Sequence, residues 1–124
     1  MGPPRREPID APGWNDKAAV AILVVCARHL LSVEPPPLTP ERLAQLVAGH
    51  TFPQLVVLFE HSPEARVRDD AARLRRLALA GQVVYHGVMR GIPVALGDPV
   101  FRLDLATAAA HAGLDLFPHT PPHP

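Results

Sequence analysis

Apolar residues in the first third of the chain form one dense block, residues 18–25. The block follows Asn15 and Asp16, either of which can cap a helix, and the predicted helix runs to about Leu31. Its first two turns have no polar face. A helix that is apolar all round must be covered on most sides, so we expect it to lie inside the domain or against a second subunit.

Two later helix starts share one local chemistry. Thr39-Pro40-Glu41 and Ser62-Pro63-Glu64 each offer a hydroxyl cap, a proline at the first helical position and a glutamate in the first turn. They predict a short helix over residues 40–48 and a longer amphipathic helix over residues 63–80, which Gly81 ends.

The apolar segment Thr51–Glu60 lies between these two helices and fits two structures. Thr51 and Pro53 favour a short third helix, whereas the β-branched pair Val56-Val57 favours a strand. Helix is the preferred interpretation, and strand stays open as the alternative.

The chain after residue 81 has a pattern typical of a hairpin. Residues 82–86 are rich in β-formers, residues 87–91 read as a turn, and residues 92–96 form a second apolar run. A final alanine-rich helix is predicted to begin at Asp98 or at Asp104. The predicted fold class is therefore α+β.

The order of these elements resembles the winged helix-turn-helix proteins. An arginine-bearing helix runs through Leu-Ala-Gly into the predicted hairpin over residues 66–96, like a recognition helix followed by its wing. The resemblance covers residues 17–96 and carries no signature residues. An apolar segment of about ten residues also stands where the family has one short turn. It implies a mostly helical winged-helix-like domain with a C-terminal β-hairpin wing and a final helix.

The resemblance also implies binding of double-stranded DNA by a transcriptional regulator. In the family the recognition helix enters the major groove and the wing meets the backbone, where arginine can pair with phosphate or guanine. The candidate DNA-binding residues are Arg66, Arg68, Arg73, Arg75, Arg76 and Arg90.

A solvated helix surface is the competing interpretation of these arginines. Acidic and basic residues alternate four apart along the helix, in the pairs Glu64–Arg68, Arg66–Asp70 and Asp69–Arg73. Each such pair contributes only about 0.2–0.5 kcal/mol, and the two aspartates would repel DNA.

The overall charge supports a second functional class. Twelve basic and twelve acidic residues balance to zero, whereas a protein that neutralises phosphates is normally basic. The apolar first helix and the apolar residues 55–59 suit a non-catalytic protein–protein interaction or dimerisation module. We therefore expect a homodimer, and a protein partner is the alternative to DNA.

No motif predicts an enzyme, a cofactor or a metal site. The chain lacks a His-Glu-x-x-His pair, a nucleophile elbow and a phosphate-binding glycine loop. Cys26 is the single cysteine, and with His29 three residues later it could supply two metal ligands. A buried thiol beside a histidine at a helix end is the preferred interpretation.

The expected location is the cytoplasm, without a membrane segment. The apolar run Ala18–Ala27 is about half the roughly 20 residues that span a bilayer. Leu23-Val24-Val25-Cys26 resembles a lipoprotein processing site, but a valine precedes the cysteine and acidic residues precede the run. Proline-rich stretches at residues 1–13 and 117–124 are predicted to be flexible tails around one domain, residues 14–116.

Overall fold

The computed structural model describes residues 14–35 and 37–117, and for residues 77–84 it describes the backbone alone. Within these residues it contains five α-helices and no strand. They are α1 (Asp16–Val33), α2 (Pro40–Ala48), α3 (Phe52–Glu60), α4 (Ala65–Ala95) and α5 (Pro99–His111). The predicted tails, apart from Phe117, lie outside the described residues.

Four of the helices begin at capping residues of the kind that the sequence indicates. Asn15, Thr39 and Asp98 each accept a backbone N–H with a side-chain oxygen, at the starts of α1, α2 and α5. At the start of α3, Thr51 and Gln54 bond each other's backbone N–H groups in a capping box. The prediction of helix for the third segment is confirmed.

The start of α4 differs from the prediction. The helix begins at Ala65 rather than at Pro63, and the carboxylate of Glu64 caps it by accepting from the Arg66 N–H. The Ser62 hydroxyl instead lies 2.9 Å from the Nδ1 of His29, in the core. Ser62 is therefore part of a contact with α1 and does not cap the helix.

The predicted hairpin is wrong. Residues 82–95 continue α4 as helix, so the described residues contain no wing and the α+β class is replaced by an all-helical fold. The prediction relied on β-branched residues and on glycines at 87 and 91. Each β-branched residue or glycine lowers the stability of a helix by at most about 1 kcal/mol relative to alanine. Tertiary packing outweighs this cost.

Helical spacing of buried residues explains why this segment is a helix. Val88, Met89, Ile92 and Ala95 are buried on one side, at spacings of one, three and three. One turn earlier, the ring of Tyr85 stacks on Phe52 of α3, with 4.3 Å between ring centroids. Pro93 lies in the last turn of the helix, where it removes one backbone hydrogen bond.

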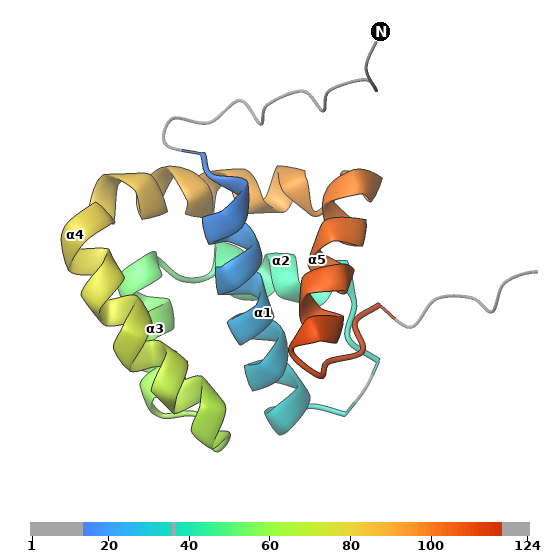
Figure 1. Ribbon diagram of the computed structural model, residues 1–124, viewed down its shortest axis with the longest axis horizontal. Helices are drawn as coiled ribbons and strands as arrows, with labels where there is room; N and C mark the ends of the chain where they lie inside the picture. The colour runs from blue at the N-terminus through green and yellow to red at the C-terminus, as the bar shows by residue number, and fades with distance from the viewer. Residues whose placement is uncertain (1–13, 36, 118–124) are drawn as a thin grey trace, which may run out of the picture.

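Helix α4 bends sharply at the point marked by its label in Figure 1. We call residues 65–76 its first arm and residues 85–95 its second arm. The two arms let one helix contact α1, α2 and α3. Its change of direction wraps the chain around the centre of the molecule.

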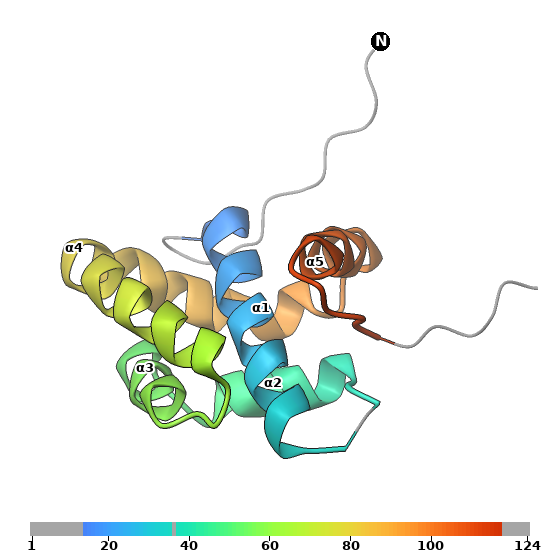
Figure 2. The same ribbon diagram turned by 60° about the horizontal axis from the view of Figure 1, so that its bottom comes forward.

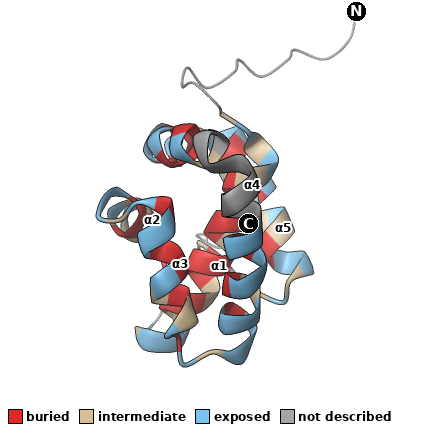
Figure 3. Cartoon of the chain, turned by 90° about the vertical axis from the view of Figure 1, so that its left-hand side faces the viewer, coloured by how far each residue is buried: buried red, intermediate tan, exposed pale blue. Residues whose placement is uncertain are grey.

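Helix α1 occupies the centre, and each of the other four helices contacts it. In Figures 1 and 2 it lies between the first arm of α4 and α5. Figure 3 shows the buried residues gathered where the helices meet. The largest fully buried side chains are Phe59, Phe101, Ile22, Leu23, Leu30, Leu43, Leu55, Ile92, Leu105, Val67, Val88 and Cys26. Among the described helices, none combines the length and apolar character that crossing a bilayer requires.

Candidate functional site

All six arginines predicted to bind DNA lie on α4, but two of them form hydrogen bonds within the protein. Arg75 donates two hydrogen bonds to the carboxylate of Glu60 at the end of α3, at 2.8 and 2.6 Å. This contact lowers the pKa of the Glu60 carboxyl. Arg68 donates to the backbone carbonyl of Ser62 at 2.7 Å. Both guanidinium groups thus connect α4 to the segment before it.

The first arm presents the other candidate arginines to solvent. Arg66, Arg73 and Arg76 are exposed, but Asp69 is exposed beside them and Asp70 lies 3.6 Å from Arg73. The acidic interruption that the sequence indicated is therefore present. It weakens the positive potential that phosphate binding requires.

Arg90 does not belong to this group. It is exposed on the second arm, beyond the change of direction of α4, and no wing places it beside the other arginines. The structure therefore does not bring the six predicted residues together on one surface.

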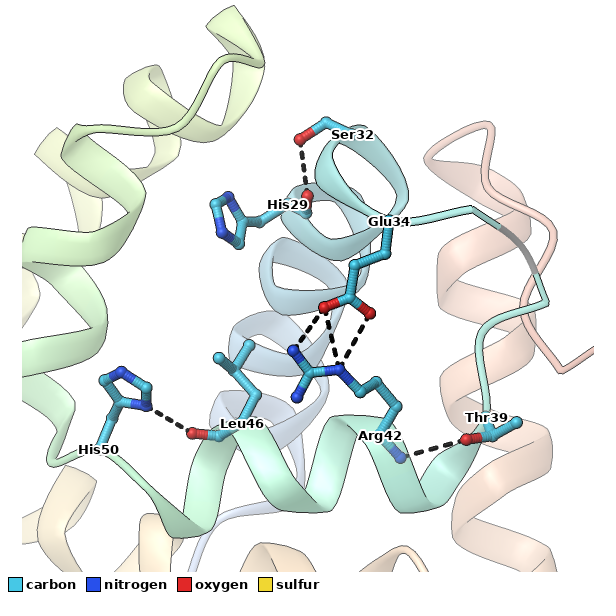
Figure 4. Close-up of polar contacts among 7 residues, drawn as sticks. All are labelled: His29, Ser32, Glu34, Thr39, Arg42, Leu46 and His50. Atoms are coloured by element: carbon cyan, nitrogen blue, oxygen red, sulfur yellow. Dashed lines mark hydrogen bonds and ion pairs between the residues drawn. The ribbon is translucent and has the colours of Figure 1, made fainter.

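Two arginines that the sequence analysis did not single out connect helices. Arg42 of α2 donates to both carboxylate oxygens of Glu34 after α1, with its Nε at 2.9 and 3.1 Å (Figure 4). The hydrogen bond from Arg42 lowers the pKa of Glu34. Arg28 of α1 donates to Asp70 of α4 at 3.2 Å and to the carbonyl of Ala112 at 3.0 Å.

A groove of about 700 Å³ lies on the outer side of α1, between the first arm of α4 and α5. We call it the α1 groove. Its lining residues are Asp16, Lys17, Val20, Ala21, Val24 and Val25 from α1, Asp70, Arg73 and Leu74 from α4, and Asp104 and Ala108 from α5. Its size is within the range of ligand and peptide sites.

The floor of the α1 groove is apolar and made of small residues. Val20 and Ala21 are neighbours on α1, and Val24 lies one helical turn further on. Ala21 is exposed, and the two valines are half-buried. Leu74 and Ala108 continue the apolar surface onto the neighbouring helices. Small side chains allow another backbone to approach α1 closely.

Charged residues line the rim of the groove. Asp70 is held between Arg28 and Arg73, so the rim on the α4 side is internally neutralised. Lys17 is exposed at the other end of α1 and forms no ion pair with the described residues. Among the described residues that line the groove, Lys17 is a cation without an ion pair, and the acidic side chains of Asp16 and Asp104 line the same groove.

A second, more polar hollow of about 410 Å³ lies beyond Arg28, between the ends of α1 and α5 and the start of α4. Arg28, Ser32, Glu64 and Arg66 are among its lining residues. The Arg28 guanidinium bonds both Asp70, which lines the α1 groove, and the carbonyl of Ala112 at the end of α5. The carboxylate of Glu64 opposes the binding of an anion in this hollow.

The side chains that the sequence offers as metal ligands or nucleophiles are dispersed or buried in the described part of the chain. They contain no group of three or more metal-ligating side chains. Cys26 is fully buried, and burial raises the pKa of its thiol, which disfavours the reactive thiolate. Ser62 and His29 form a hydrogen-bonded pair, but both are buried away from the α1 groove.

Comparisons of the chain with protein-family models, curated proteins and solved structures return no significant match.

The sequence feature that belongs to the groove is the apolar block of α1, and it predicts a buried surface instead of an open groove. Residues 18–25 are apolar on all sides, and the absence of a polar face predicts a covered helix. The structure covers most of that surface but leaves Ala21 exposed and Val24 half-buried.

Proposed function

We propose that this protein is a non-catalytic interaction module that binds an amphipathic helix of a partner protein in the α1 groove. The observation that carries the proposal is the apolar floor of Val20, Ala21 and Val24, left open between two helical walls. Apolar grooves of this kind take up the apolar face of a helix through residues spaced three and four apart.

The dimensions of the groove suit a short helix. The residues of α1 that line the groove run from Asp16 to Val25, which is about 14 Å at 1.5 Å per residue, or two and a half helical turns. A partner helix with small or branched apolar residues on one face would cover the floor. An acidic residue on the flank of that helix would pair with Lys17.

The groove proposal is tested by placing a charge on the floor. Ala21→Glu puts a carboxylate where the partner's apolar face must lie, and it should abolish co-purification of a stoichiometric partner from the native cells. Gln45→Glu adds the same carboxylate on the exposed side of α2, outside the groove, and should leave co-purification intact. Circular dichroism checks that both variants are equally helical.

Two results would count against the proposal. If Ala21→Glu retains the partner at full stoichiometry, the partner binds elsewhere. If the unchanged protein has no polypeptide partner and is a monomer, the module has no occupant.

A second candidate function is DNA binding by the first arm of α4, which the exposed side chains of Arg66, Arg73 and Arg76 favour. This proposal requires weak, salt-sensitive binding to duplex DNA. Arg73→Glu combined with Arg76→Glu should remove that binding, and each lost phosphate contact should flatten the salt dependence by about one unit. Failure of the unchanged protein to bind any duplex at low salt would end this candidate.

A further inference from the structure

A buried polar pair connects α1 to the point where the chain passes from α3 to α4. His29 and Ser62 are 7% and 2% exposed, and the Nδ1 of His29 lies 2.9 Å from the Ser62 Oγ. The His29 ring also packs against Phe59, with 6.0 Å between ring centroids. We call residues 59–65, which hold both of these contacts, the α3–α4 corner.

The hydrogen bonds of Ser62 favour the form of His29 that leaves Nδ1 as an acceptor. The Ser62 Oγ accepts the backbone N–H of Glu64 at 3.2 Å, so its own hydrogen can be donated to a neighbour. The Nδ1 of His29 accepts that hydrogen only when the ring is neutral, with its proton on Nε2. A protonated ring has a hydrogen on Nδ1 as well, and the Ser62 hydrogen then loses its acceptor.

The surroundings favour the neutral ring. Burial lowers the pKa of His29, and the carboxylate of Glu34 acts in the opposite direction more weakly. The ring points away from the Glu34–Arg42 ion pair in Figure 4, towards the green ribbon. On the remaining adjoining elements, Glu60 is paired with Arg75. The charged residues at the start of α4 are Glu64, Arg66 and Arg68, and the Arg68 guanidinium donates to the Ser62 carbonyl. The other histidine of the corner, His61, has its Nδ1 2.8 Å from the backbone carbonyl of Val57.

We propose that the His29–Ser62 pair is an acid-sensitive latch that holds the α3–α4 corner against α1 and releases it when His29 is protonated. The proposal stands on the burial of both side chains and on their 2.9 Å contact, which joins residues 33 apart in the chain. It does not depend on the α1 groove having a partner, because neither residue lines that groove.

The direction of the effect follows from proton linkage. A histidine whose pKa is lowered by folding binds fewer protons in the closed corner than in the open one. Closure is therefore fully favoured above the ordinary histidine pKa of 6.5 and is weakened as the pH falls below that value. The opening equilibrium rises by at most about tenfold per pH unit, since one proton is involved.

The tautomer can be read directly in the unchanged protein. Histidine ¹⁵N correlation spectra at pH 7.5 should show His29 neutral, with its proton on Nε2. A proton on Nδ1 at that pH would overturn the proposal, because the Ser62 hydroxyl would then be the acceptor in both states.

Release of the corner can be measured by backbone amide hydrogen exchange at pH 7.5 and at pH 5.5. The rates are divided by the intrinsic exchange rate at each pH. Peptides covering residues 59–68 should gain exchange below about pH 6.5, while peptides from residues 40–48 in α2 should not. His29→Asn keeps an acceptor near the Nδ1 position but cannot be protonated, so its corner should exchange independently of pH.

Ser62→Ala gives a second variant. Its corner should exchange faster already at pH 7.5 and respond less to acid, because protonation no longer breaks a hydrogen bond. An equal acid response in the unchanged protein and in His29→Asn would overturn the latch. So would an equal gain of exchange in all peptides, which reports global unfolding.

Discussion

The two sides of α1 consist of the same kinds of apolar residue but differ in how far they are buried. On the inner side, Ile22, Leu23 and Cys26 are completely buried among the other helices. On the outer side, Ala21 is exposed and Val24 half-buried in the floor of the α1 groove. Neighbouring apolar residues of α1 are therefore buried or exposed according to whether another helix of the same chain covers them.

This difference shows that one apolar helix of a small domain can contribute both to the core and to an open surface. Covering the inner side accounts for the stability of the fold, whereas the outer side has an apolar floor that the described helices leave uncovered. Single substitutions on the two sides should therefore separate folding from binding.

The largest effect is expected on the inner side. Leu23→Ala removes a fully buried side chain from the centre of the core and should lower the free energy of unfolding by about 2–5 kcal/mol. Urea denaturation followed by circular dichroism measures it. A loss below about 1 kcal/mol would mean that α1 is not the centre of the core.

Arg28→Ala should have the next largest effect, since Arg28 ties α4 to the end of α5. Its side chain is 14% exposed, and its removal leaves the Ala112 carbonyl and part of Asp70 without a donor. We expect a loss of about 1–3 kcal/mol in the same denaturation experiment. Arg66→Ala, an exposed arginine of the neighbouring hollow, is the matched control and should change little.

Val24→Ala is the direct counterpart of Leu23→Ala, one residue along the chain. Because Val24 is half-buried, its truncation should cost only about 0.5–1 kcal/mol. A cost as large as that of Leu23→Ala, measured by the same denaturation, would show that the outer side belongs to the core.

Ala21→Glu should leave stability within about 0.5 kcal/mol, because the side chain points into the open groove. Thermal unfolding measures this directly. A clear loss of stability would contradict the assignment of this face to binding, whatever happens to a partner.

Local signals in the sequence predicted helices correctly where a cap and a spacing agreed. Thr39, Thr51 and Asp98 all cap helices as expected. The β-branched residues and glycines of the second arm of α4 indicate a hairpin, whereas Val88 and Ile92 have the spacing of a helix. Long-range contacts such as the Tyr85–Phe52 stack decide the structure there.

Long-range contacts also decide the candidate site. The arginines on α4 could be identified from the sequence, but their partners Glu60 and Asp70 could not be assigned with certainty. The pairing of Arg28 with Asp70 joins residues 42 apart in the chain. The α1 groove needs walls from α4 and α5, so residues 18–25 alone could not distinguish a covered surface from an open one.

Photo-crosslinking from the groove floor tests the central claim most directly. A benzoylphenylalanine placed at position 21 should crosslink in cells to one partner, within a single amphipathic helix, while the same group at position 45 should not. Crosslinking from position 45 but not from position 21, or no crosslinked polypeptide from either, would contradict the account.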